Sequence, residues 1–171
     1  MLASQEFQTD QAARYERVRQ FSEWLCEPLN LEDLGLQACP EVSPPRWHLA
    51  HTTWLFETFV LKPTVPGYKV WNPAFEYLFN SYYNGIGAQY PRGQRHLLSR
   101  PGMEEVQQWR AYVDTAMKRL LSTNPTAEQL ALVELGIHHE QQHQELLITD
   151  LKYSFSHNPL YPVYRESGCT G

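Results

Sequence analysis

The sequence is poor in cysteine and has no long apolar run, and each of these shortages excludes a class of protein. Its 171 residues include only three cysteines, Cys26, Cys39 and Cys169, which are widely spaced and form no Cys-x-x-Cys pair. A disulfide framework is therefore not expected, and a reducing compartment fits. No apolar run approaches the roughly 18–20 residues of a membrane span, and the first residues lack the charged-then-apolar order of a signal peptide. We expect a cytoplasmic protein with no membrane partner.

The charge balance also argues against a nucleic-acid partner. Lys and Arg number 14 against 19 Asp and Glu, which gives a formal net charge of −5, and no basic block stands out. Apolar residues are plentiful, since hydrophobic residues make up 42% of the chain and aromatic residues 13%. This composition is ordinary for a globular protein, and the length suits one domain with a sizeable core.

No segment alternates in the manner of a strand, and the apolar residues recur instead at steps of three and four, which is typical of helices. Capping residues support three of the starts: Thr9 or Asp10, the hydroxyl of Ser43 before two prolines, and Thr126 in a capping box with Gln129. We therefore predict an all-α, four-helix bundle, with a short additional helix. The expected helices cover residues 10–25, 45–62, 73–83, 103–121 and 127–153.

Two connections, at residues 62–72 and 89–100, are longer than a plain helical bundle needs. The second carries arginines at positions 92, 95 and 100. Because long loops in compact domains are often functional, we expect part of the function to lie in these two segments.

Three of the seven histidines fall within six residues, at positions 138, 139 and 143. Each helical residue turns about 100°, so His139 and His143 share a face about 40° apart, and His138 points elsewhere. The pair has the spacing by which His-Glu-x-x-His helices bind a metal. A zinc metalloprotease is one interpretation, but no third ligand follows at the spacing of that class. Asp150 shares the stripe of the pair but lies roughly 16 Å along the axis from His139, too far to bind the same ion.

A third ligand has to come from another helix, and His48 and His51 are the candidates. They are three residues apart, so either can face the core, and His51 has Trp47 and Trp54 as helical neighbours. A buried imidazole among aromatic rings needs a polar partner, and a metal ion is one such partner. Three imidazoles suit zinc or iron(II), with copper or nickel less favoured, and leave coordination positions open as catalytic sites do.

Four motifs, in the same order, resemble the DinB-like N-terminal domain of the ergothioneine-biosynthesis sulfoxide synthases, also called hercynine oxygenases. The likeness covers about residues 10–165. The motifs are Ser43-Pro-Pro-Arg-Trp-His-Leu-Ala-His-Thr-Thr-Trp54 with Phe56-Glu57, Leu78-Phe-Asn-Ser-Tyr-Tyr83, the loop Pro91-Arg-Gly-Gln-Arg95 through Leu98-Ser-Arg-Pro-Gly102, and His138-His-Glu-Gln-Gln-His-Gln-Glu145.

The resemblance implies a non-haem iron(II) enzyme that uses O2 to join a thiol, cysteine or γ-glutamylcysteine, to the imidazole of hercynine, giving a sulfoxide. In that family three histidines bind the iron, and they match His51, His139 and His143 here. The alternatives are a stand-alone DinB-like thiol transferase that uses zinc and a non-catalytic helical interaction domain.

The resemblance also suggests substrate-binding residues. Gln142 matches the family's glutamine that hydrogen-bonds the hercynine imidazole. Arg92 and Arg95 match the loop arginines that bind the carboxylate of the thiol substrate, a role that suits a guanidinium fork.

Complete members of the family carry a second domain, similar to formylglycine-generating enzymes, which supplies the active-site tyrosine. We therefore interpret residues 1–158 as the metal-binding bundle and 159–171 as a tail or linker to that domain, provided in cis or in trans. No catalytic residue is assigned within this chain, and the reaction is expected to need the second domain.

Overall fold

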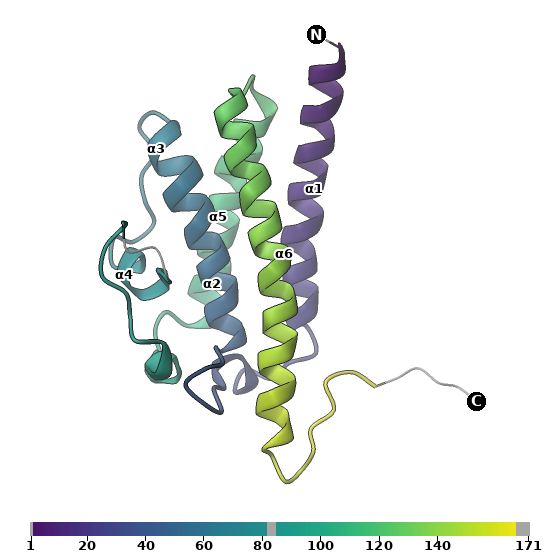
Figure 1. Ribbon diagram of the computed structural model, residues 1–171, viewed down its shortest axis with the longest axis vertical. Helices are drawn as coiled ribbons and strands as arrows, with labels where there is room; N and C mark the ends of the chain where they lie inside the picture. The colour runs from purple at the N-terminus through teal and green to yellow at the C-terminus, as the bar shows by residue number, and fades with distance from the viewer. Residues whose placement is uncertain (1, 82–84, 167–171) are drawn as a thin grey trace, which may run out of the picture.

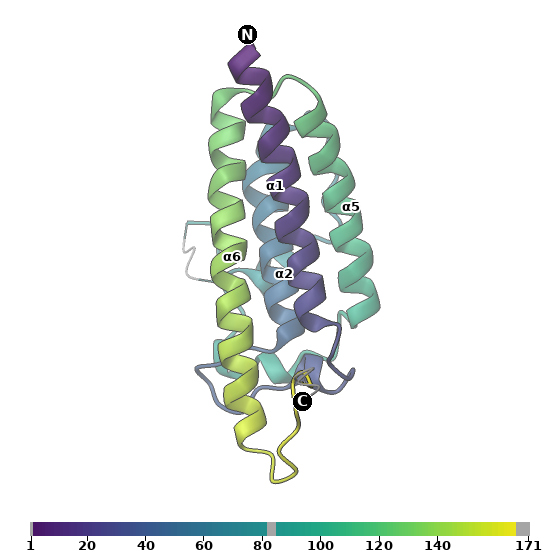
Figure 2. The ribbon, with the colours of Figure 1, turned by 90° about the vertical axis from the view of Figure 1, so that its right-hand side faces the viewer.

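The computed structural model describes residues 2–81 and 85–166, and every regular element within them is helical. Four long helices lie side by side, with α1 and α6 running in one direction and α2 and α5 in the other (Figure 1, Figure 2). The prediction of an all-α four-helix bundle is confirmed. The four helices are α1 (Leu2–Cys26), α2 (Pro45–Leu55), α5 (Met103–Ser122) and α6 (Ala127–Ser156).

The shorter elements lie in the connections. A 3-10 turn, η1 (Asp33–Gly35), precedes α2, which continues through a π-helical turn, η2 (Phe56–Leu61), into α3 (Lys62–Thr64). A long crossover then returns along the outside of α2 to the start of α5 (Figure 1). It contains α4 (Phe75–Phe79) and a second 3-10 segment, η3 (Arg92–Leu97). Because α2 and α5 are parallel neighbours, only a long connection can join them.

The predicted capping box at the start of α6 is present. The Thr126 hydroxyl accepts the amide hydrogen of Gln129 at 3.2 Å, and the Gln129 side-chain oxygen accepts that of Thr126 at 2.8 Å. Two of the free N–H groups of the first turn are thereby satisfied. The helix then runs without interruption past the histidine cluster to Ser156, three residues beyond the predicted end.

Two expected helices had the wrong bounds, and one expected cap is absent. The first helix begins at Leu2 rather than near Asp10, because good helix formers and no breaker precede that position. Pro44, in extended conformation, occupies the N-cap of α2, and the Ser43 hydroxyl instead accepts a hydrogen bond from Arg95. The helix expected over 73–83 covers only Phe75–Phe79, and Tyr82 and Tyr83 lie outside the described residues.

The core lies between the four helices. At Gly136, the backbone of α6 lies close to the ring of Phe56. A Cβ on Gly136 of α6 would lie 2.4 Å from Cε1 of Phe56, which is fully buried on the π-helical turn. The glycine therefore lets this turn pack directly against α6. Other fully buried side chains fill the same space: Tyr15, Leu49, Trp54, Trp109, Val113, Met117 and Ile137.

The segment after α6 turns back, and its residues Tyr164 and Arg165 contact α1. The Tyr164 hydroxyl donates to the carbonyl of Leu25 at 2.7 Å, and Arg165 donates to that of Trp24 at 2.8 Å. The Arg165 guanidinium also lies 3.6 Å from the centroid of the Trp24 ring. These contacts satisfy carbonyls in the last turn of α1. None of the helices in the described part of the chain is long and apolar enough to cross a membrane.

Candidate metal centre

Three imidazole rings from two helices meet between α2 and α6. His51 comes from the middle of α2, and His139 and His143 come from successive turns of α6. One nitrogen from each ring can be chosen so that all three lie within 4.8 Å of one another. The spacing of four residues on α6 puts the centroids of the His139 and His143 rings 4.5 Å apart, as the helical geometry requires. The three residues grouped by sequence are thus brought together, and their role as ligands stays a prediction.

The orientation of His51 is fixed on three sides. Its ring stacks on Trp47 at 4.6 Å and on Trp54 at 5.4 Å, with interplanar angles of 12° and 16°. Its Nδ1 lies 2.6 Å from the carbonyl oxygen of Phe79. Because a carbonyl only accepts, Nδ1 carries the hydrogen and the lone pair is on Nε2. That nitrogen faces α6 and is available to a metal.

The distances between these nitrogens suit a shared cation. Nε2 of His51 lies 3.2 Å from Nε2 of His139. Two imidazole nitrogens bound to one ion at about 2.1 Å, at octahedral or tetrahedral angles, lie about 3.0–3.4 Å apart. Nδ1 of His139 is buried and has no hydrogen-bond partner among the described residues, so no described contact of Nδ1 prevents Nε2 from holding the lone pair. The three rings could therefore hold a metal ion.

Electrostatics keep the cluster in the state that binds metals. Burial is the largest effect: it lowers the pKa of His139 to about 4 and holds the pKa values of His51 and His143 well below their ordinary range. The proximity of the rings adds to this effect, because each would repel a second positive charge. All three are therefore neutral at pH 7, as metal ligation requires.

A fourth histidine and a carboxylate lie beside the cluster. Nδ1 of His48 is 2.9 Å from Nδ1 of His143, and its Nε2 is 3.0 Å from a carboxylate oxygen of Asp150. The sequence named His48 only as an alternative to His51, and Asp150 only as a residue too distant to be a ligand. No signal in the sequence predicts the contact between His48 and Asp150, because it forms only where α2 packs against α6.

The rings open into a cavity of about 230 Å³ between α2, α6 and the crossover. Arg95 is buried in its wall, donating to the hydroxyls of Ser43 at 2.7 Å and Ser81 at 3.1 Å. Its guanidinium lies 3.3 Å from the centroid of the Trp47 ring. The loop at 89–100 therefore does reach the site, whereas residues 62–72 do not line this cavity.

The other two predicted substrate-binding residues lie at the rim of the cavity. Gln142 is exposed on α6, between the two histidines of that helix. Arg92 is also exposed, and its guanidinium donates to the carbonyl of Glu41. The structure thus brings Gln142, Arg92 and Arg95 to one cavity with the three rings, and their binding roles stay predictions.

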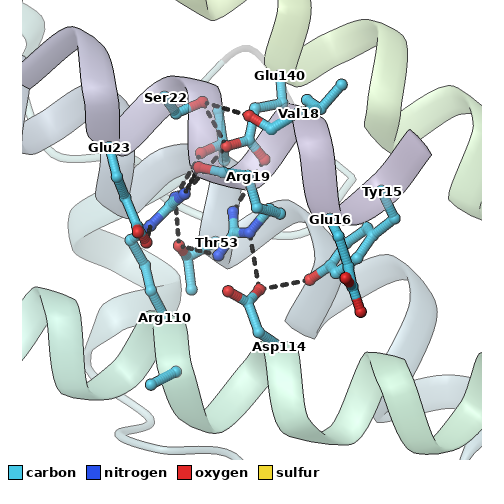
Figure 3. Close-up of polar contacts among 12 residues, drawn as sticks. Tyr15, Glu16, Val18, Arg19, Ser22, Glu23, Thr53, Arg110, Asp114 and Glu140 are labelled. Atoms are coloured by element: carbon cyan, nitrogen blue, oxygen red, sulfur yellow. Dashed lines mark hydrogen bonds and ion pairs between the residues drawn. The ribbon is translucent and has the colours of Figure 1, made fainter. Parts of the chain in front are cut away.

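The glutamate of the His-Glu-x-x-His motif points away from the cluster. Both oxygens of Glu140 are engaged in the bundle interior: one accepts from Arg19 at 2.9 Å, and the other from Ser22 at 2.7 Å and Arg110 at 3.1 Å (Figure 3). In a metalloprotease this carboxylate acts as the general base beside the metal. The metalloprotease interpretation is therefore excluded by the orientation of Glu140.

This buried network ties all four helices together. Arg19 of α1 also pairs with Asp114 of α5 at 2.7 Å and donates to Thr53 of α2 at 3.0 Å (Figure 3). Burial raises the pKa of the Glu140 carboxyl, but the guanidiniums of Arg19 and Arg110 outweigh this and hold the pKa below its usual value. Because Glu140 is anchored inside the bundle, the neighbouring His139 faces α2.

The family of the chain follows from a sequence comparison. The family model described as the DinB superfamily matches residues 14–147, which include the whole histidine cluster. The chain belongs to the DinB superfamily. Among curated proteins the comparison gave no match. DinB superfamily members are often metal-dependent enzymes, and in this one the three-histidine cluster lies where α2 and α6 face each other.

Proposed function

We propose that this chain is the iron-binding domain of a non-haem iron(II), O2-dependent sulfoxide synthase of ergothioneine biosynthesis. The observation that carries the proposal is the convergence of His51, His139 and His143 within 4.8 Å of one another. The four motifs that resemble this enzyme family support it, since they contribute the three rings and the cavity beside them. Iron(II), when bound, supplies the chemistry that activates O2.

The substrates are hercynine and either cysteine or γ-glutamylcysteine. The reaction forms one C–S bond and one S–O bond: the imidazole C–H, the thiol S–H and O2 give the sulfoxide and water. O2 is the four-electron oxidant, with one of its atoms in the sulfoxide and the other in water. Gln142, exposed at the rim, hydrogen-bonds the hercynine imidazole, and Arg95 and Arg92 face the carboxylate of the thiol substrate.

The proposal includes a second domain, similar to formylglycine-generating enzymes, that acts in cis or in trans. The open side of the cavity, where Gln142 and Leu146 are exposed, is where its residues would complete the hercynine pocket. Metal binding needs only residues of this chain, so it is the first step to test.

Anaerobic reconstitution with iron(II), followed by metal analysis, tests the site. Wild type is expected to retain about one iron per chain and His139→Ala to lose it, because a three-ligand site cannot spare an imidazole. His138→Ala is the matched control: this neighbouring ring is exposed, lies outside the histidine cluster and pairs with Glu134 at 3.0 Å. Equal iron in wild type and His139→Ala would disprove the centre.

Hercynine binding to the iron-loaded chain tests the role of Gln142. Calorimetric titration should show binding at least several-fold weaker in Gln142→Leu, with iron content unchanged, because a hydrogen bond to the substrate is lost. Gln141→Leu is the matched control, since that side chain is exposed and does not line the cavity. A loss of iron in Gln142→Leu would show that the residue acts on the metal instead.

A zinc-dependent thiol transferase is the second candidate, favoured by the chemistry of the donor set. Three neutral imidazoles suit zinc as well as iron(II). Hercynine, a thiol and O2 should give sulfoxide with iron and the second domain present. Transfer of a thiol to an electrophile with zinc alone would favour the second candidate. A chain that binds neither metal would fit a non-catalytic interaction domain.

A further inference from the structure

His48 is the one histidine beside the cluster that the proposed ligand set does not use. It lies on α2 one turn before His51, and its ring is almost wholly buried. Both ring nitrogens are engaged across the helix interface, one with His143 and the other with Asp150 of α6. A buried imidazole with two such partners has a defined arrangement of hydrogens, and that arrangement can be deduced from the contacts.

Asp150 determines which ring nitrogen of His48 carries the hydrogen. One carboxylate oxygen accepts the amide hydrogen of Ser43 at 2.8 Å and lies 3.0 Å from Nε2 of His48. A carboxylate only accepts, so Nε2 of His48 carries the hydrogen. In a neutral imidazole the other nitrogen is then bare, and Nδ1 of His48 is an acceptor.

The contact between His48 and His143 then determines which nitrogen of His143 carries the hydrogen. Nδ1 of His48 lies 2.9 Å from Nδ1 of His143, a hydrogen-bonding distance between two ring nitrogens. Since the first is bare, the second must carry the hydrogen. The lone pair of His143 is therefore on Nε2. His51 reaches the same tautomer by another route, through the carbonyl of Phe79.

We propose that Asp150 and His48 form a positioning relay that fixes His143 as an Nε2 metal ligand. The inference rests on the metal site of the proposed function and adds two residues that act on the ligand rather than on the ion: His48 contacts His143, and Asp150 contacts His48. Hydrogen bonds of this kind orient an imidazole ligand and increase its basicity. Here the imidazole of His48 lies between the Asp150 carboxylate and the ligand His143. Residues of both α2 and α6 therefore determine the orientation and tautomer of the His143 ring.

Cobalt(II) titration of the full chain tests the relay, with visible absorption to report coordination geometry and a competing chelator to give affinity. Asp150→Asn should bind cobalt about 10- to 100-fold more weakly than wild type, the range seen when outer partners of metal ligands are removed. Glu145→Gln makes the same change of charge on the same helix at an exposed position, and its affinity should equal that of wild type.

Two substitutions of His48 separate its acceptor function from its volume. His48→Asn can place a side-chain oxygen near the position of Nδ1, and this oxygen can accept the hydrogen of His143. His48→Leu fills similar space without an acceptor. We expect the asparagine variant to bind cobalt more tightly than the leucine variant, with an absorption spectrum closer to that of wild type. Thermal unfolding shows whether each variant is folded.

Each outcome bears on a different claim. Failure of wild type to bind cobalt would overturn the metal site and the relay together. Binding by wild type with equal affinity in Asp150→Asn and His48→Leu would overturn the relay and leave the metal site standing. If His48→Leu abolishes binding as fully as His51→Ala and asparagine restores nothing, His48 is a ligand and the positioning role is wrong.

Discussion

Glu140 shows how one residue of a metal-binding motif can serve the bundle instead of the ion. Its carboxylate accepts from Arg19 and Arg110 in the interior. Glu140→Gln should lower the free energy of unfolding by about 3 kcal/mol, because it removes the buried carboxylate that Arg19 and Arg110 share. The loss lies at the low end for a broken buried pair, because each guanidinium keeps a second carboxylate, Asp114 or Glu23. Urea denaturation measures this. Glu134→Gln is the control on the same helix: its pair with Arg14 is partly exposed, and less than about 1 kcal/mol is expected.

The same carboxylate predicts a dependence on pH. The pKa of Glu140 is held below its usual value, because the two guanidiniums outweigh the opposing effect of burial. The stability that this group contributes is therefore fully present above the unfolded pKa of about 4.3, and is lost as the pH falls through the lower folded pKa. Wild type should lose stability below about pH 4 by an amount that Glu140→Gln does not. Parallel acid denaturation curves for the two proteins would contradict the assignment.

At the scale of elements, the contact between the π-helical turn and α6 depends on Gly136. Gly136→Ala should cost about 1–3 kcal/mol of stability, because the added Cβ would lie 2.4 Å from the buried ring of Phe56. The better helix propensity of alanine, about 1 kcal/mol, offsets only part of this. Chemical denaturation measures the net effect.

A double-mutant cycle identifies the cause of that cost. Phe56→Leu removes the ring that the new Cβ meets, so the double variant should lose clearly less stability than the two single variants together. Strict additivity would mean that the strain lies elsewhere, for example in the backbone of α6.

At the scale of the whole molecule, the bundle should fold without the segment after α6. Tyr164 and Arg165, in the described part of that segment, contact α1 through two hydrogen bonds to helix carbonyls and one guanidinium over Trp24. A chain ending at Asn158 should therefore unfold cooperatively and lose only about 1–3 kcal/mol. It should also bind iron as the full chain does, since none of the described residues beyond 158 lines the metal cavity. Non-cooperative unfolding would show that the tail is part of the fold.

Local signals were enough to predict most of the helices and the pairing of His139 with His143. Apolar spacing and the capping box located α5 and α6 closely, because these signals act within a few residues. The turn per residue put the two histidines of α6 on one face, and His51 was the third candidate through its aromatic neighbours. The helix predicted over 73–83 was too long for α4, and the early start of α1 was missed, because neither has a local signal as strong.

What each of these side chains faces depends on how the helices pack. Glu140 and His139 are adjacent in sequence, yet one enters the charged interior and the other the cavity, because Arg19 and Arg110 hold the carboxylate inside. Asp150 cannot reach the ion along its own helix, yet it contacts the site through His48, which α2 brings across from the other side. These pairings join residues that are 30 to 121 positions apart in the chain, and they form only when the helices pack.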